Sequence, residues 1–211
     1  METPIVKLTK DDLEKVYEPS EDSFLLIDSL EADLNNLKAL KPMMCMEIGS
    51  GSGIVITALA LASQKEWFSH FIAIDVNPDA CRVTKNTSVI NRTSIDIIQM
   101  DLTSAFQSRH IFDLIIFNPP YVITETIEIE DKNLITKSWA GGKNGREVMD
   151  RVIPLIPELL SKNGIFYLVA IKENNIENII KILEHLNMTG KVIGERKVRG
   201  EHLYVIKFVK K

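Results

Sequence analysis

The sequence has few cysteines, no long apolar run and no excess of positive charge. Its two cysteines, Cys45 and Cys81, belong to no metal-spaced pair and its four histidines are scattered, so we expect no metal site in this chain. The first residues, up to Asp12, lack the apolar core of a signal peptide, and no apolar stretch approaches the length of a membrane span. We therefore expect a protein of a reducing intracellular compartment with no membrane partner.

The length and net charge of the chain indicate how many domains it has and which partners it attracts. The chain has 211 residues and a formal net charge of −4, with 45% hydrophobic and 26% charged residues. These values predict one globular domain over residues 1–211 with a full hydrophobic core, in which residues 1–16 form an N-terminal extension. The negative charge gives no general attraction toward nucleic acid, although it does not exclude a local basic patch.

Short apolar runs alternate with amphipathic segments, a pattern typical of an α/β domain with a mainly parallel sheet. The predicted strands are residues 43–48, 68–74, 95–100, 112–117 and 165–171, followed by an antiparallel pair at 191–198 and 203–209. The predicted helices are residues 20–40, 54–64, about 78–89, 146–160 and 175–186.

Local signals refine two of these helices. Pro154 and Pro157 should dent the fourth predicted helix, because each proline removes a backbone donor. Asn77 or Asp79 is expected to cap the third, with Pro78 in its first turn.

The tetrapeptide Asn118-Pro119-Pro120-Tyr121 indicates a possible reaction as well as a local structure. It follows the predicted strand 112–117 and precedes a long polar connection, residues 122–143, of a kind that is often functional. The prolines stiffen the chain and push the preceding residues toward extended geometry. The resulting corner has free carbonyls and the Asn118 amide, which can accept two hydrogen bonds from a planar NH2 group while the Tyr121 ring lies against it. The alternative is a strand that simply ends in a proline turn.

Glycine and acidic residues follow the first three predicted strands, where ligands bind in open α/β sheets. The first strand runs into Gly49-Ser50-Gly51-Ser52-Gly53, whose glycines allow close approach of a ligand. A dinucleotide fingerprint would need glycine where the chain has Ile54. Asp75 can accept both ribose hydroxyls, and Asp101 can accept a hydrogen bond from an adenine amine. Together these residues predict a site for an adenosine-containing cofactor, although each acid alone could be a helix cap or a solvated loop residue.

This ordered set resembles the class I S-adenosylmethionine-dependent methyltransferases that carry an (Asp/Asn)-Pro-Pro-(Tyr/Phe) motif. Residues 17–26, 139–151 and 172–175 are similar to the eukaryotic and archaeal HemK-like glutamine methyltransferases, which modify the Gly-Gly-Gln glutamine of class 1 translation release factors. The resemblance runs from about residue 17 to the C-terminus. It implies a Rossmann-like domain with helices on both faces of a seven-stranded sheet, in the order 3-2-1-4-5-7-6, and a C-terminal antiparallel hairpin.

The resemblance also implies roles for individual residues. It implies S-adenosylmethionine as the methyl donor and S-adenosylhomocysteine as the product, with the cofactor against Glu21, Ser23, Glu47, Gly49, Gly51, Asp75, Asp101, Leu102 and Asn118. Asn118 and the Pro119 carbonyl would hold the target amide nitrogen while Tyr121 packs on it. Pro120 and Trp139 would also contact the substrate. From the residues alone, the Trp139 segment is a glycine-rich turn, which we interpret as a lid that faces the substrate.

A partner is expected at one edge of the sheet. In the strand order above, residues 95–100 form an edge strand that carries Ile95, Ile97, Ile98 and Met100 but no lysine or proline. Natural edge strands are usually blocked by such residues, so either a helix or loop covers this edge or another chain adds a strand to it. The resemblance supplies a candidate, a small zinc-binding activator subunit that several translation-related methyltransferases share.

The sequence thus predicts a cytoplasmic enzyme, compatible with a nuclear fraction, that N5-methylates a release-factor glutamine as the catalytic subunit of a heterodimer. The main alternative is adenine N6 methylation of DNA or RNA, because the same corner can accept an exocyclic amine. That reaction would need a base-flipping surface and phosphate contacts. The residues are also compatible with protein lysine methylation and, more remotely, with a non-catalytic binding scaffold.

Overall fold

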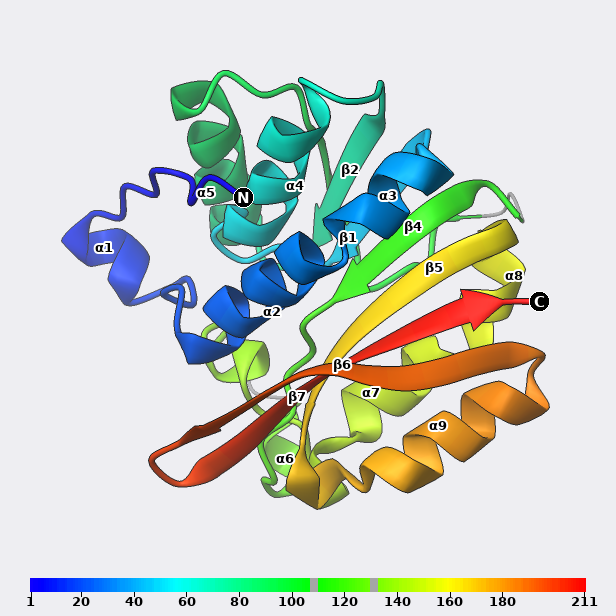
Figure 1. The fold of residues 1–211 in the computed structure, drawn as a ribbon. Helices are drawn as coiled ribbons and strands as arrows, with labels where there is room; N and C mark the ends of the chain where they lie inside the picture. The colour runs from blue at the N-terminus through cyan, green and yellow to red at the C-terminus, as the bar shows by residue number, and fades with distance from the viewer. Residues whose placement is uncertain (107–109, 130–132) are drawn as a thin grey trace.

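A seven-stranded sheet organises the molecule, and its strands lie in the predicted order β3-β2-β1-β4-β5-β7-β6 (Figure 1). The computed structural model describes residues 1–106, 110–129 and 133–211. The strands are β1 (Met44–Ile48), β2 (His70–Asp75), β3 (Asp96–Gln99), β4 (Phe112–Phe117), β5 (Leu160–Ile171), β6 (Met188–Val198) and β7 (Glu201–Lys210). The first five strands pair in parallel, and β7 lies antiparallel between β5 and β6.

Helices pack around this sheet (Figure 1). They are α1 (Lys10–Leu13), α2 (Glu21–Ala32), α3 (Leu34–Leu40), α4 (Ile54–Ser63), α5 (Pro78–Ile90), α6 (Thr126–Ile129), α7 (Glu147–Val152), α8 (Ile156–Leu159) and α9 (Ile176–His185). The central strands β1 and β4 are almost entirely buried, because neighbouring strands and helices cover them on all sides. The predicted core strands are therefore confirmed, including Cys45 as a small buried side chain.

The predicted helix 20–40 is wrong, because the structure divides it into α2 and α3 at Asp33. The Asp33 carboxylate accepts a hydrogen bond from the Tyr167 hydroxyl and pairs with the Lys207 ammonium group, both at 2.5 Å. These partners lie on β5 and β7, so the break is set by an anchor to the sheet. No local helix-breaking residue marks it in the sequence.

Several other boundaries also differ from the prediction. The predicted helix 146–160 is α7, a 3-10 turn at Ile153–Leu155 and α8, because Pro154 and Pro157 each start a new helical segment. The cap of α5 is Asn77, whose side chain accepts from the Asp79 amide at 2.9 Å. Strand β5 begins five residues earlier than predicted because a bulge lets it pair further with β4, and β3 is one residue shorter at each end.

The corner after β4 is held by the chain that follows it. The Val122 amide donates to the Trp139 carbonyl at 3.1 Å, and the Gly141 amide donates to the Val122 carbonyl at 2.8 Å. Val122 and Ala140 therefore form a short parallel bridge. The connection 122–143 thus returns to its own start and lays the Trp139 segment beside the corner.

A buried asparagine, Asn174, fixes the same corner from the end of β5. Its side-chain nitrogen donates to the carbonyls of Tyr121 at 3.0 Å and Asn144 at 2.9 Å, and its oxygen accepts from the Ile171 amide at 2.8 Å. Gly145 has a φ of +64°, and a Cβ there would lie only 1.9 Å from the Tyr121 carbonyl oxygen. The corner therefore depends on close approach of three backbone segments.

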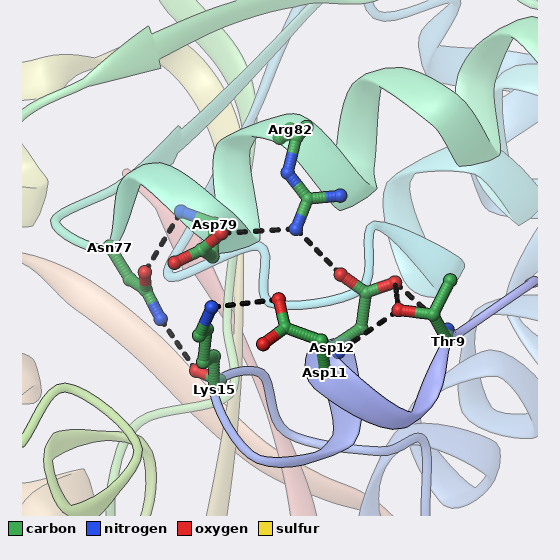
Figure 2. A network of polar contacts seen from close by, with 7 residues as sticks. All are labelled: Thr9, Asp11, Asp12, Lys15, Asn77, Asp79 and Arg82. Carbon is green, nitrogen blue, oxygen red and sulfur yellow. Dashed lines mark hydrogen bonds and ion pairs between the residues drawn. The ribbon is translucent and has the colours of Figure 1, made fainter.

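The N-terminal extension is fastened to α5 (Figure 2). Thr9 and Asp12 form a capping box on α1, and the Asp12 carboxylate also accepts from the Arg82 guanidinium at 2.6 Å. The Asn77 side chain donates to the Lys15 carbonyl at 2.7 Å. The hydrogen bond from Arg82, followed by those from Thr9, lowers the pKa of Asp12 from 3.8 to about 2.

We predict that Gly145→Ala destabilises the fold by about 3 kcal/mol, because it combines a left-handed φ with a backbone collision. Gly200→Ala is the matched control, since Gly200 also has a positive φ, of +91°, but nothing lies within 4 Å of the added Cβ. It should cost only about 1 kcal/mol. Urea unfolding measures both, and equal losses would contradict the role given to Gly145.

We also predict that Asp12→Asn lowers the free energy of unfolding in a pH-dependent way. Because the folded pKa of Asp12 is depressed, the stabilisation by its carboxylate is fully present above 3.8 and is lost as the pH falls through about 2. The difference between wild type and Asp12→Asn should therefore shrink as the pH falls from about 5 to about 2.

Chemical denaturation across this pH range measures that difference. Asp11→Asn is the control, because it removes only an exposed ion pair with Lys15 and should change stability little. A difference between wild type and Asp12→Asn that stays constant with pH would refute the linkage.

Candidate active site

A cavity of about 310 Å³ opens at the carboxyl ends of the parallel strands. Most of the predicted site residues line it together, namely Ser23, Glu47, Gly49, Gly51, Asp75, Asp101, Leu102, Asn118, Pro119 and Pro120. A second cavity adjoins it and contains the remaining three, Glu21, Tyr121 and Trp139. Tyr17 and Ser138 line both cavities, so the two spaces share a wall.

The glycine loop after β1 is tied to the acid at the end of β2. Gly49 and Gly51 have φ values of +67° and +53°, a backbone geometry that glycine adopts without strain. The Gly51 amide donates to one Asp75 oxygen at 2.9 Å, and the Asn77 amide donates to the other at 2.9 Å. Burial raises the pKa of Asp75. Its oxygens are thus fixed by backbone donors and keep acceptor capacity suited to a diol.

Glu47 is a buried carboxyl in the cavity wall, with an exposed fraction of 2%. One of its oxygens accepts from the Ile56 amide at 3.1 Å, and burial raises the pKa of Glu47 to about 8. Among the described residues it pairs with no lysine or arginine. A ligand that brings positive charge or hydroxyl donors would add to the one hydrogen bond that Glu47 accepts from the Ile56 amide.

Asp101 lines the cavity and already has one hydrogen-bond partner. Its carboxylate accepts from the Arg151 guanidinium at 2.5 Å, and both side chains are about half exposed. The neighbouring Leu102 has a φ of +49°, which is uncommon for a leucine. Asp101 therefore has one oxygen engaged by Arg151, a partner that is 50 residues away in the sequence.

The Asn118 amide has a fixed orientation. Its nitrogen donates to an Asp22 carboxylate oxygen at 3.0 Å, and the Tyr121 hydroxyl donates to the same oxygen at 3.2 Å. The Asn118 side-chain oxygen is buried and has no hydrogen-bond partner among the residues that the structure describes. A buried acceptor left without a partner costs about 1–3 kcal/mol, so this atom is suited to a donor on a ligand.

The second cavity combines the Trp139 segment with the tip of the β6–β7 hairpin. Trp139 is 36% exposed and lies there with Tyr121, as a lid that faces a substrate would require. Arg199 and Glu201 contribute from the hairpin.

Glu21 does not line the first cavity, in contrast to the predicted position over the cofactor. Its carboxylate accepts from the Arg196 guanidinium at 2.8 Å instead. Residues two apart on a helix lie on nearly opposite faces, so Glu21 and Ser23 cannot both point into one cavity.

Several residues that line the two cavities were not predicted, among them Tyr17, Asp22, Lys137 and Arg151. Tyr17 and Asp22 lie in the segment 17–26 that carries the family resemblance, and Arg151 ends the segment 139–151. The family resemblance therefore indicated that these segments belong to the site, but it did not indicate which of their side chains face the cavities.

Two further observations concern metal ions and membranes. Among residues 1–106, 110–129 and 133–211, no group of three or more histidine, cysteine, aspartate or glutamate side chains is arranged to hold a metal ion. Within the same residues, every helix is too short or too polar to cross a membrane.

Comparisons with known proteins agree with this geometry. The family described as methyltransferase small domain matches residues 22–197. Human methyltransferase HEMK2 is 44% identical over 197 residues, which cover 92% of this chain and 90% of the human protein. The eRF1 methyltransferase catalytic subunit mtq2 of Schizosaccharomyces pombe is 32% identical over 98% of this chain and 95% of its own length.

A solved structure extends the likeness to three dimensions. The E. cuniculi Mtq2–Trm112 complex, described as responsible for methylation of the eRF1 translation termination factor, matches with a TM-score of 0.68 and 26% identity. The match covers 93% of this chain and 99% of that chain. The chain therefore belongs to the methyltransferase small domain family, in its HemK-like branch.

Proposed function

We propose that this chain is the catalytic subunit of a cytoplasmic enzyme that transfers a methyl group from S-adenosylmethionine to the side-chain nitrogen of a release-factor glutamine. The observation that carries the proposal is the buried, unpartnered Asn118 oxygen in the wall of the first cavity. The substrate class is supported by the relatives, since the fission yeast protein is an eRF1 methyltransferase subunit and the E. cuniculi complex methylates eRF1.

The first cavity fits the methyl donor. Asp75 would accept from the ribose hydroxyls, Gly49 and Gly51 would allow close backbone approach, and Glu47 would face positive charge or hydroxyl donors. Asp101 would contribute its remaining acceptor capacity to the adenine amine. S-adenosylmethionine, when bound, supplies an electrophilic methyl group and leaves as S-adenosylhomocysteine.

Two acceptors at the corner would prepare the glutamine nitrogen. An amide nitrogen is a poor nucleophile because its lone pair is delocalised into the carbonyl group. The Asn118 oxygen and the Pro119 carbonyl would accept its two N–H groups, direct the lone pair and stabilise positive charge that develops on nitrogen. The nitrogen would gain the methyl group as the bond from that carbon to sulfur breaks, and would then release one proton to water, which gives N5-methylglutamine.

The second cavity would admit the protein substrate. Its lining includes Tyr121, Asp22, Trp139 and the tip of the β6–β7 hairpin. We infer that the glutamine passes from this side toward Asn118, with Pro120 and Tyr121 forming the walls of its path. Substrate and methyl donor would then meet at the corner from separate cavities.

Labelled S-adenosylmethionine tests the function directly. Release factor, histone and DNA are offered side by side to the chain with its partner, and label is expected on the release-factor glutamine. Loss of label when that glutamine is replaced would show that the glutamine is the methylated residue. Preferential labelling of DNA or histone would refute the proposed substrate, because the same acceptor pair also suits an exocyclic amine or a lysine.

We predict that Asn118→Ala and Asp75→Ala separate chemistry from cofactor binding. Asn118→Ala should lower kcat by about 100-fold or more while the cofactor Kd changes by less than about 3-fold. Asp75→Ala should weaken cofactor binding by about 10- to 100-fold. Calorimetry gives the Kd, and loss of cofactor binding in Asn118→Ala would exclude the role given to that residue.

The edge strand β3 is the proposed site of the partner. It pairs only with β2, and of its four residues Asp96, Ile98 and Gln99 are exposed while Ile97 is half-buried. No lysine or proline protects it. We propose that a small zinc-binding subunit adds a strand here, as the presence of Trm112 in the E. cuniculi complex suggests.

We predict that Ile98→Lys disrupts this association, because it places a charge on the pairing strand. Leu186→Lys is the matched control, since Leu186 is exposed to the same extent, 36%, but follows α9 at the other end of the sheet. Co-expression with the partner followed by affinity purification should recover the complex from Leu186→Lys and not from Ile98→Lys. Equal recovery from both variants would place the partner elsewhere.

A further inference from the structure

A buried carboxylate, Asp22, lies behind the corner and has all its acceptor sites filled. One of its oxygens accepts from the backbone amide and the hydroxyl of Ser23, at 2.6 and 3.2 Å. The other accepts from the Asn118 amide nitrogen and the Tyr121 hydroxyl, at 3.0 and 3.2 Å. Only 3% of Asp22 is exposed, so its charge is held by these four donors.

We propose that Asp22 is a positioning residue that sets the orientation of the Asn118 amide. Because of Asp22, position 118 of this chain requires asparagine for activity and does not accept aspartate. The inference rests on the proposed function, in which the Asn118 oxygen accepts from the target nitrogen. Asp22 does not line the first cavity and lies on the second, on the far side of the Asn118 nitrogen from the Asn118 oxygen. It acts through Asn118.

The orientation follows from what a carboxylate can do. An ionised carboxylate only accepts hydrogen bonds, whereas an amide has one donor end and one acceptor end. The Asn118 nitrogen must therefore face Asp22, and the Asn118 oxygen must face away from it. A flipped amide would bring two oxygens to about the present 3.0 Å separation and would leave Asp22 short of a donor. The unpartnered oxygen is thus imposed by Asp22.

The same contact excludes aspartate at position 118. A carboxylate there would stand against the Asp22 carboxylate across the 3.0 Å contact that now joins donor to acceptor. Two like charges at that separation repel each other, and the donor that Asp22 now meets is lost. The identity of residue 22 therefore dictates the identity of residue 118, although the two lie 96 positions apart.

Replacing Asp22 by asparagine keeps the shape but removes one acceptor. The single oxygen of the new amide cannot serve both Ser23 and Asn118, because these lie on different carboxylate oxygens. If its oxygen stays with the Ser23 amide, its NH2 group faces Asn118 and turns that side chain around. The corner would then present a donor to the target NH2 group.

Four proteins test the coupling: wild type, Asp22→Asn, Asn118→Asp, and the double variant Asp22→Asn/Asn118→Asp. We expect Asp22→Asn to lower kcat by about 10- to 100-fold and to leave the cofactor Kd within about 3-fold. Asn118→Asp should be less active still. The double variant should regain at least about 10-fold over Asn118→Asp, because the amide introduced at position 22 can donate to the new carboxylate, whose second oxygen then faces the cavity.

Asp28→Asn is the matched control on the same helix. Its carboxylate is 59% exposed and pairs with Arg196 on the surface, so kcat should not change. Thermal unfolding of every variant separates a positioning effect from loss of fold. Wild-type kcat in Asp22→Asn, or a double variant no better than Asn118→Asp, would overturn the proposal.

Side-chain amide exchange gives a readout that needs no substrate. In ¹⁵N-labelled wild type the Asn118 NH2 protons should exchange slowly, because they are buried against Asp22, and in Asp22→Asn they should exchange at least about 10-fold faster. Unchanged exchange would refute the orientation by Asp22 whatever the substrate is. If wild type fails to methylate the release factor while this exchange result holds, the proposed substrate fails and the positioning role stands.

Discussion

The hydrogen bond between Asp22 and Asn118 joins the start of the first long helix to the end of a central strand, and the site is arranged around it. Because the carboxylate can only accept, it decides which end of the amide faces the cavity. It also accepts from the Tyr121 hydroxyl, so that Asn118 of the first cavity and Tyr121 of the second are held by the same carboxylate oxygen. The position of the helix therefore matters as much to the chemistry as the proline corner does.

Much of this arrangement could be predicted from the sequence. Apolar runs located the central strands, and the glycine loop and strand-end acids located the cavity, because strand ends converge on one edge of a parallel sheet. Side-chain pairings between distant residues could not be predicted in this way. Asp33 breaks a helix because Tyr167 and Lys207 hold it, and Asp101 meets Arg151. These contacts depend on how elements pack, which local patterns do not encode.

One choice among the predicted residues could be sharpened from the sequence alone. The helical repeat places Glu21 and Ser23 on opposite faces of α2, so only one of them could approach the cofactor. The same repeat, with Ser23 toward the cavity, leaves Asp22 between the two faces, where the structure has it buried against the corner. Knowing the family assigned the segment to the site, while helix geometry was needed to choose among its residues.

The carboxylates of the site differ in how their charge is supported. Asp22 is saturated by four donors, Asp75 is held by two backbone amides, and Glu47 has one. The least supported group, Glu47, is the one whose pKa burial raises to about 8. The number of hydrogen bonds that each carboxylate accepts from the protein is thus four for Asp22, two for Asp75 and one for Glu47. A bound cofactor could add donors to Asp75 and Glu47, which line the first cavity.

The bridge between Val122 and Ala140 separates the position of the corner from the length of the loop that follows it. It closes a ring in the chain immediately after the corner, so a change in the length of the segment between these residues need not move the corner itself. Insertions or deletions there could reshape the surface offered to a new protein substrate while the acceptor geometry is inherited unchanged. The bridge therefore makes the acceptors of the corner independent of the length of this loop.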